Sequence, residues 1–411
     1  MEKVSNIKVN VFSFISNYLP SLLSSLIIRG GAIFCFILFG RFLSLEEFSD
    51  FSFAYNFSMI LAGLIVSPLI SVYSRYNEEF GFCFIRTMNL IFLFMFVFTL
   101  LMFLLPYQSI SFVASLLVVF VFFFISQYVF IDLHYFDMEY VYPLITVFSS
   151  ALMWGGLFYI YFFGFYSIGD FLVFVFIFIV FYFVLNGIYN GYVLKGEGRI
   201  SGFTITGWKL LFLFRKLMPV ISSSLVAGFG FALFFYVINE RNIQSQEQKA
   251  VFNVAYQWFQ VVVFFSVALN SKLLLTLNKN NKPEMECFKI MLLCFCLYFF
   301  ALLVYVVFST FYVGLDKGLI LEVGLVIISA SLLSALSNVV GVYLLYKEQL
   351  KLGFWLNIVW VVNLYVIYFV VFNGSGLSIH VALSILISYF CHFVVLILFA
   401  SRLGYARSLH K

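Results

Sequence analysis

The sequence predicts an all-α polytopic membrane protein with twelve transmembrane helices, arranged as two six-helix lobes related by a pseudo-two-fold axis. The first observation is composition: 64% of the 411 residues are hydrophobic and 10% are charged, whereas soluble domains carry roughly a quarter charged residues. The second is that the apolar runs are long enough to cross a hydrocarbon core of about 30 Å as helices. The third is an internal repeat.

The repeat joins the beginning of the chain to its middle. The stretch YLPSLLSSLIIRGG at 18–31 aligns with LMPVISSSLVAGFG at 217–230, and AYNF at 54–57 aligns with AYQW at 255–258. The offset is 199 residues at Pro20/Pro219 and 201 at Tyr55/Tyr256. A repeat of this size predicts two halves of similar structure. In a membrane, such halves usually form a transporter with the substrate site at their interface.

The apolar runs place the predicted spans in order along the chain. They are 18–39, 48–72, 87–105, 111–131, 141–163, 170–194, 217–238, 251–271, 288–309, 319–346, 352–372 and 377–400. The predicted domains are an N-terminal lobe (1–200), a cytoplasmic linker (201–216) and a C-terminal lobe (217–411). Six spans per lobe is an even number, so both lobes enter the membrane in the same direction and the axis runs along the membrane normal.

The lysines and arginines predict the orientation. With both termini in the cytoplasm, eighteen of these residues lie inside and four outside, the four being Arg41, Arg241, Lys249 and Lys317. Cytoplasmic loops are enriched in Lys and Arg, so this distribution favours both the span count and the cytoplasmic termini. Residues 1–17 lack a cleavage-site pattern, and we expect them to lie along the inner interface.

Arg29 is the one basic residue left inside a span. The repeat aligns it with Gly228, near the centre of the seventh span, so Arg29 is predicted near the bilayer centre. A central arginine costs at least about 2.5–3.5 kcal/mol and is expected to face a wet cavity or a partner. One interpretation is an anion site, since a guanidinium binds phosphate in bidentate fashion. The other is a structural arginine that bonds backbone carbonyls of another span.

Amide side chains mark further candidate sites. Asn253, Gln257 and Gln260 share one face of the eighth span, and the repeat places Ser52 and Asn56 at matching positions of the second. Two facing polar stripes are predicted to line a hydrated channel between the lobes, although interhelical hydrogen bonds alone would also account for them. Asn186 and Asn190 form a similar pair on the sixth span.

An acidic group lies between the fourth and fifth spans. Asp132, Asp137 and Glu139, with His134, could couple transport to H⁺ or Na⁺, because histidines and paired carboxylates shift their pKa easily; a solvated loop is the alternative. The cysteines show neither metal-ligand spacing nor a disulfide framework. No phosphate-binding loop or nucleophile–base pair is found, so we expect no enzyme activity, no cofactor and no metal site.

The first 80 residues resemble polysaccharide flippases of the Wzx type, in the MATE-like MOP superfamily. The likeness lies in the basic N-terminus, in FGRFLSLEEFSDFSFAY at 39–55 and in SPLISVYSRYNEE at 67–79. The family's helix exit, R-hydrophobic-L-x-x-x-E-F/Y-G, is matched by Arg41, Leu43, Glu47 and Phe48, while Ser49 replaces the usual glycine. The twelve-span, two-lobe organisation extends the likeness over the whole chain.

The resemblance implies alternating access by two six-helix lobes in the bacterial inner membrane. The cargo would be an undecaprenyl-pyrophosphate-linked oligosaccharide, an O-antigen or capsule repeat unit of lipopolysaccharide or polysaccharide biosynthesis, moved from the inner to the outer leaflet. Family members carry basic residues in the central cavity, and Arg29 matches that role, although few other charges accompany it here. Membrane lipids, and the polymerase and chain-length proteins of the pathway, would be partners; nucleic acid would not.

Three alternatives remain open at this point. A cation-coupled multidrug antiporter of the same superfamily would need a carboxylate well inside the first six spans, and the sequence offers none there. A membrane-embedded polysaccharide polymerase would need a large outer loop with catalytic residues, and no outer loop exceeds about a dozen residues. An assembly scaffold would not explain why an arginine, Arg29, lies inside a span.

Overall fold

The computed structural model describes residues 19, 23–24, 26–80, 114–116, 118–120, 122, 142–163, 207–243, 245–279, 283–347 and 349–408. In this part of the chain the regular structure is helical throughout. The predicted spans at 87–105 and 170–194, and most of 111–131, lie outside the described residues.

Long helices account for the predicted spans that can be compared. Residues 26–42 are helical and are followed by α2 (Leu45–Phe80) and α5 (Tyr142–Phe163). The second half continues with α7 (Gly207–Val237), α8 (Gln246–Lys279), α9 (Pro283–Phe308), α10 (Lys317–Tyr346), α11 (Leu350–Val366) and α12 (Ser378–Ser408). Short turns of other helix types extend three of these: Ile238–Asn242 follows α7, Ser309–Phe311 follows α9 and Ile367–Val371 follows α11.

Seven of the described helices are long and apolar enough to cross a membrane. They include all six spans predicted after residue 216 and the span predicted at 141–163. The helices α2, α7, α8 and α12 extend beyond the apolar runs, because backbone hydrogen bonding continues where the side chains become polar. Residues 207–216 of the predicted linker are therefore the first turns of α7.

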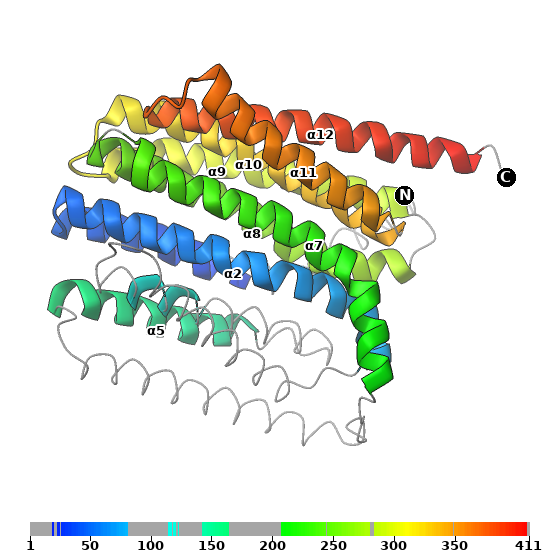
Figure 1. Ribbon diagram of the computed structural model, residues 1–411. Coiled ribbons are helices and arrows are strands. Elements are labelled where there is room, and N and C mark those ends of the chain that lie inside the picture. The colour runs from blue at the N-terminus through cyan, green and yellow to red at the C-terminus, as the bar shows by residue number, and fades with distance from the viewer. Residues whose placement is uncertain are drawn as a thin grey trace, which may run out of the picture.

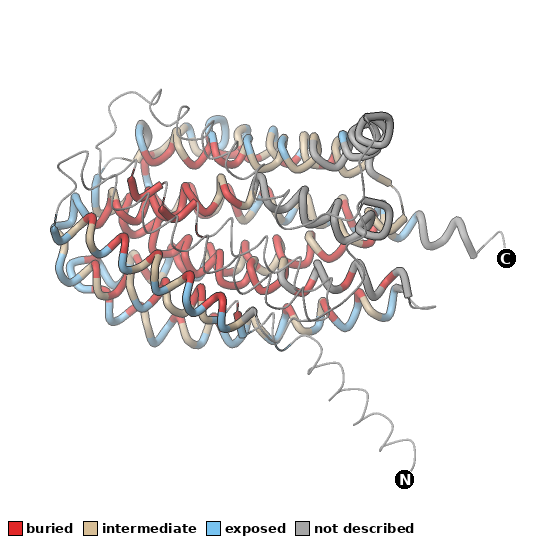
Figure 2. Tube along the Cα trace, turned by 90° about the horizontal axis from the view of Figure 1, so that it is seen from below, coloured by how far each residue is buried: buried red, intermediate tan, exposed pale blue. Residues whose placement is uncertain are grey.

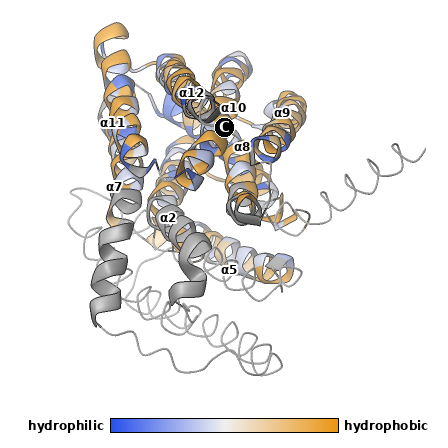
Figure 3. Cartoon of the chain, turned by 90° about the vertical axis from the view of Figure 1, so that its right-hand side faces the viewer, coloured by the Kyte–Doolittle hydropathy of each residue, from blue (hydrophilic) through white to orange (hydrophobic). Residues whose placement is uncertain are grey.

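The helices lie side by side, with α8 near the middle. Figures 1 and 3 show α2 and α5 on one side of α8, and α9, α10 and α12 on the other. Of the Gln246–Val267 span, 89% is buried, against 22% of Glu284–Phe311 in α9. Figure 2 shows the buried residues concentrated where neighbouring helices face each other. The position of α8 thus places its polar residues inside the bundle.

The peripheral helices present apolar side chains to the surroundings. On α9 the exposed residues include a stripe spaced at helical intervals, formed by Phe288, Leu292, Phe295, Phe299 and Leu303. Figure 3 shows the same hydrophobic covering on α9 and α11. A soluble protein does not expose a stripe of this length, whereas a lipid-facing helix requires one.

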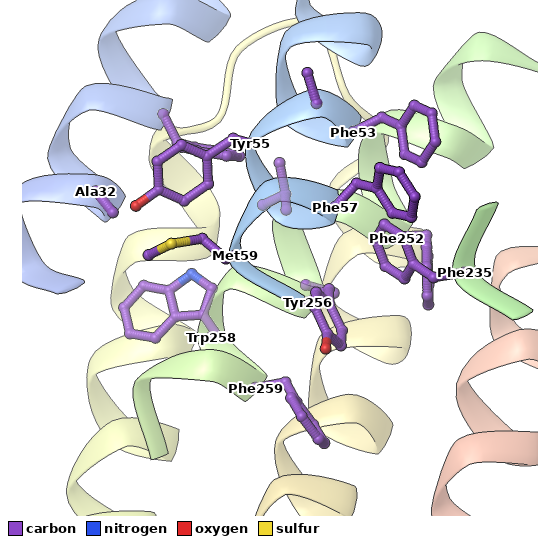
Figure 4. Packing of buried hydrophobic residues seen from close by; sticks show 14 of the residues in the cluster. Ala32, Phe53, Tyr55, Phe57, Met59, Phe235, Phe252, Tyr256, Trp258 and Phe259 are labelled. Carbon is purple, nitrogen blue, oxygen red and sulfur yellow. The ribbon is translucent and has the colours of Figure 1, made fainter. Parts of the chain in front are cut away.

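Aromatic rings pack α2 against the second half of the chain. Phe53 of α2 stacks on Phe235 of α7, with ring centroids 5.9 Å apart, and Phe57 lies 5.8 Å from Tyr236. Figure 4 shows Phe53, Phe57 and Phe235 with Phe252 and Tyr256 in a single cluster. One buried core therefore continues from the first half of the chain into the second.

A capping box fixes the start of α2. The Glu47 backbone N–H donates to Ser44 Oγ (3.3 Å), and the Ser44 backbone N–H donates to Glu47 Oε2 (2.9 Å). This reciprocal pattern satisfies two backbone donors that a helix start leaves open. It also gives a physical reason for the glutamate in the helix-exit motif noted in the sequence.

We predict that Ser44→Ala lowers the free energy of unfolding by about 1 kcal/mol, the usual value of an N-cap hydroxyl. The Ser44 hydrogen bonds hold the pKa of Glu47 below its ordinary value. Because the pKa of Glu47 is lower in the folded than in the unfolded protein, the ionised carboxylate stabilises the fold at any pH above the unfolded-state pKa. This stabilisation is lost as the pH falls through the folded-state pKa. Thermal unfolding in detergent at neutral and acidic pH would measure the cost of Ser44→Ala and its pH dependence. An equal loss of stability at every pH would contradict the contribution of the Glu47 carboxylate.

Candidate functional site

The candidate site lies where α2 and the helical segment 26–42 meet α7 and α8. We call this contact the seam. The polar residues that the repeat analysis selected on α2 and α8 come together here, although they are about two hundred positions apart in the chain. The seam is flanked by the aromatic cluster of Figure 4.

An ion pair closes the seam near the N-terminal ends of α2 and α8. Lys249 Nζ lies 3.1 Å from Asp50 Oδ1 and 3.8 Å from Glu240 Oε1, and it stands 5.1 Å from the centre of the Phe53 ring. The Lys249 side chain is 10% exposed. Asp50 and Lys249 are 199 residues apart, so the pair joins the first half of the chain to the second.

Buried amides form the middle of the seam. Asn56 Nδ2 donates to the backbone oxygen of Asn253 (2.8 Å) and to its Oδ1 (3.1 Å), and Gln257 Nε2 donates to Asn56 Oδ1. Asn253 Nδ2 in turn donates to Asn239 Oδ1 at 2.7 Å. Asn56 and Asn253 are fully buried. The two predicted polar stripes therefore hydrogen-bond to each other directly in this conformation, and the hydrated channel between them stays a prediction.

Arg29 lies next to these amides and is 4% exposed. Its Nη1 donates to Gln260 Oε1 at 2.6 Å, and its guanidinium carbon stands 4.5 Å from the centre of the Phe264 ring. Gln260 Nε2 is 3.4 Å from Asn56 Oδ1, so Gln260 contacts both the arginine and the amide group. Arg29 is thus inside the bundle, at the seam, and its position near the bilayer centre stays a prediction.

One buried acceptor at the site has no hydrogen bond from any described residue. This is Gln257 Oε1, on a side chain that is 1% exposed. Leaving a buried acceptor unsatisfied costs about 1–3 kcal/mol. A hydroxyl group or a water molecule reaching this point would remove that cost, so the site can accept a hydrogen-bond donor as well as an anion.

Other predicted candidates are placed apart or cannot be compared. Asn186, Asn190, Asp132, His134 and Asp137 lie outside the described residues. Elsewhere, Asn357 Nδ2 of α11 donates to Ser223 Oγ of α7 at 3.0 Å, so this amide joins two helices of the second half. In the parts of the chain that the structure describes, His, Cys, Asp and Glu side chains do not gather in groups of three or more that could hold a metal.

Sequence reasoning missed several members of the site. Asp50, Lys249, Asn239 and Phe264 were not selected, because nothing in the local sequence around them is unusual for a span end or an apolar helix. The repeat gave no signal for the ion pair, since at the offset of 201 that relates α2 to α8, Asp50 corresponds to Val251 and not to Lys249. A repeat shows which positions correspond, but it does not show which side chains touch.

Comparison with solved structures identifies the fold. The chain matches an outward-facing multidrug resistance MATE family transporter of the MOP superfamily at a TM-score of 0.64 and 14% identity, covering 94% of this chain and 95% of that one. It matches a MOP superfamily transporter from Pyrococcus furiosus, and a MATE structure in complex with MaD5, each at 0.62 and 13% identity with the same coverage. The protein therefore has the MOP transporter fold, which confirms the predicted fold class.

Sequence comparison adds nothing to this, because neither the family models nor the curated proteins give a match. The Pyrococcus protein is described as having a binding pocket of reverse polarity, which suggests a different function for that protein.

Proposed function

We propose that this protein is a transporter that moves an undecaprenyl-pyrophosphate-linked oligosaccharide, an O-antigen or capsule repeat unit, from the inner to the outer leaflet of the bacterial inner membrane. Arg29 carries the proposal: it is a buried cation at the seam, surrounded by amides. The MOP fold supports transport by rocking of two lobes, because solved proteins of this fold are transporters. Both termini would lie in the cytoplasm.

The chemistry of the seam suits this cargo. Sugars and phosphates cross hydrocarbon poorly because they lose their hydration. Arg29 offers a planar set of donors that matches phosphate oxygens. Sugar hydroxyls need hydrogen-bond donors and acceptors, and the amides of Asn56, Asn253 and Gln257 offer both. Gln257 Oε1 in particular is an acceptor that receives no hydrogen bond from a described residue. The isoprenoid tail would remain among the lipids.

Multidrug export is the second candidate, because the solved structures include a multidrug resistance transporter. A site for a cationic drug needs negative charge. In the described part of the seam the central charged group is the Arg29 cation, and the Asp50 carboxylate is paired with Lys249. The polarity of the site thus favours an anionic cargo, while a polymerase function would need catalytic groups that the seam does not supply.

We predict that Arg29→Gln weakens binding of a polyprenyl diphosphate ten- to a hundred-fold, since a charge-assisted hydrogen bond contributes about 1.5–3 kcal/mol. Arg29→Lys keeps the charge, so its affinity should lie between that of the wild type and that of Arg29→Gln. Arg41→Ala, which removes an exposed arginine, is the matched control. Purified protein in liposomes would be assayed for flipping of a fluorescent polyprenyl-diphosphate sugar.

The same variants in a deletion strain test the cargo in cells. Loss of flipping leaves no surface repeat unit on the lipopolysaccharide, whereas loss of polymerisation leaves a single one. Full export by Arg29→Gln would remove Arg29 from the mechanism, and resistance to cationic dyes conferred by the wild type would favour the multidrug function instead. Cross-linking of the pathway's polymerase and chain-length proteins would test the proposed partners.

A further inference from the structure

We propose that Gln260 is an internal competitor for the anion site, and that its displacement by cargo loosens the seam. This inference rests on the proposed function, because it assigns a role to a second residue of the same site. Gln260 Oε1 accepts a hydrogen bond from Arg29 Nη1 at 2.6 Å. A carboxamide oxygen thereby occupies a position that a phosphate oxygen would take.

The exchange favours the cargo. A neutral carboxamide gives the guanidinium one acceptor oxygen, whereas a diphosphate gives several charged ones that can bind in bidentate fashion. The diphosphate also carries negative charge, which attracts the guanidinium, whereas the carboxamide offers only a dipole. The Phe264 ring, 4.5 Å from the guanidinium carbon, supports Arg29 from the side of α8 by a cation–π contact. Arg29 can therefore exchange acceptors without giving up that support.

Gln260 also holds the two sides of the seam together. Arg29 and Gln260 are 231 residues apart, on segment 26–42 and α8, so their bond crosses the seam. The Nε2 atom of Gln260 lies 3.4 Å from Asn56 Oδ1 on α2, which is a second contact across it. When cargo displaces Gln260, its bond to Arg29 is lost. Gln260 Nε2 is then no longer held in position to contact Asn56 Oδ1.

The remaining contacts across the seam are then fewer. Asn56 keeps its bonds to Asn253 and Gln257, and Asp50 keeps its ion pair with Lys249. A ligand shifts a conformational equilibrium only through contacts that differ between the states. The Arg29–Gln260 bond is such a contact. It forms when the site is empty and is broken when cargo binds, so it stabilises the closed seam in the empty protein alone.

The test compares two substitutions with opposite expected effects. Gln260→Ala removes the competitor, and the affinity for undecaprenyl diphosphate in detergent should rise about ten-fold, the equivalent of 1.4 kcal/mol. Gln260→Glu places a carboxylate beside Arg29, and the affinity should fall at least ten-fold. Gln349→Ala, a glutamine outside the seam, should leave it unchanged. Inorganic pyrophosphate serves as a parallel probe, to separate the headgroup's contribution from the lipid's.

Opening of the seam is measured in the same variants. Spin labels at Phe163→Cys and Val371→Cys, two exposed positions on opposite sides of the seam, would be placed in a protein without its native cysteines. The distance distribution should broaden towards longer values in the wild type with diphosphate, and in Gln260→Ala without it. Gln260→Glu should keep the short distance in both conditions.

The outcomes separate this inference from the proposed function. Failure of the wild type to bind either diphosphate would overturn the proposed function and this inference with it. Binding that depends on Arg29, combined with an equal loss of affinity in Gln260→Ala and Gln260→Glu, would overturn the competitor role alone, since Gln260 would then be a direct contact of the cargo. A label distance that does not respond to diphosphate would overturn the coupling.

Discussion

A reversible covalent link between positions 50 and 249 is expected to stop transport completely. Asp50 and Lys249 form the ion pair that closes the seam near the N-terminal ends of α2 and α8. If the two lobes rock apart during transport, these positions must separate in every cycle. The Asp50→Cys/Lys249→Cys protein, joined by a short bifunctional methanethiosulfonate in a cysteine-free background, should show no flipping in liposomes, and a reducing agent should restore it.

The matched control uses an ion pair that does not cross the seam. Glu286 and Lys289 lie three residues apart on α9, with Nζ and Oε1 separated by 2.7 Å. The same link between Glu286→Cys and Lys289→Cys should leave the rate unchanged. Flipping at the unlinked rate by the protein linked at 50 and 249 would show that the seam stays closed throughout the cycle.

Replacing Gly324 with leucine is expected to prevent stable folding. Gly324 lies in α10, where an added Cβ would collide with the ring and hydroxyl of Tyr305 from α9. That hydroxyl donates to the backbone oxygen of Ile320, one turn earlier, and Tyr305 is fully buried. Overpacking of a tight core usually costs about 1–3 kcal/mol, and a clash with a fixed aromatic ring lies at the upper end or beyond.

A milder series makes this prediction measurable. Gly324→Ala should lower the unfolding temperature in detergent, and adding Tyr305→Ala should cost less than the sum of the two single effects, because the smaller residue removes the collision. Gly341→Ala, also in α10, is the control, since its added Cβ meets nothing within 4 Å. Additive effects of Gly324→Ala and Tyr305→Ala would show that the two residues do not compete for the same space.

The sequence predicted the span positions well wherever they can be compared. Apolar runs determine where helices cross a membrane, so all six spans of the second half coincide with long helices. Helix ends were less predictable, because the backbone of α7 stays hydrogen-bonded through the basic residues that were assigned to a linker. The capping box at Ser44 and Glu47 shows that a local sequence motif can mark a helix start.

The site was predicted in part. The spacing of Asn253, Gln257 and Gln260 selected the face of α8 that meets α2, and the repeat selected Asn56. The contacts themselves could not be predicted, since the bond between Arg29 and Gln260 joins residues 231 positions apart. Periodicity describes one helix at a time, whereas pairing depends on how two helices approach each other.

The ion pair between positions 50 and 249 also favours the association of unlike halves. At the offset of 201 that relates α2 to α8, Asp50 corresponds to Val251 and Lys249 corresponds to Phe48. Two copies of the first half would therefore place Asp50 against a phenylalanine, and two copies of the second half would place Lys249 against a valine. Only the mixed arrangement gives each charge a partner of opposite sign, at the 3.1 Å observed. Because taking a charge out of water without a partner is costly, this pair works against self-association of either half.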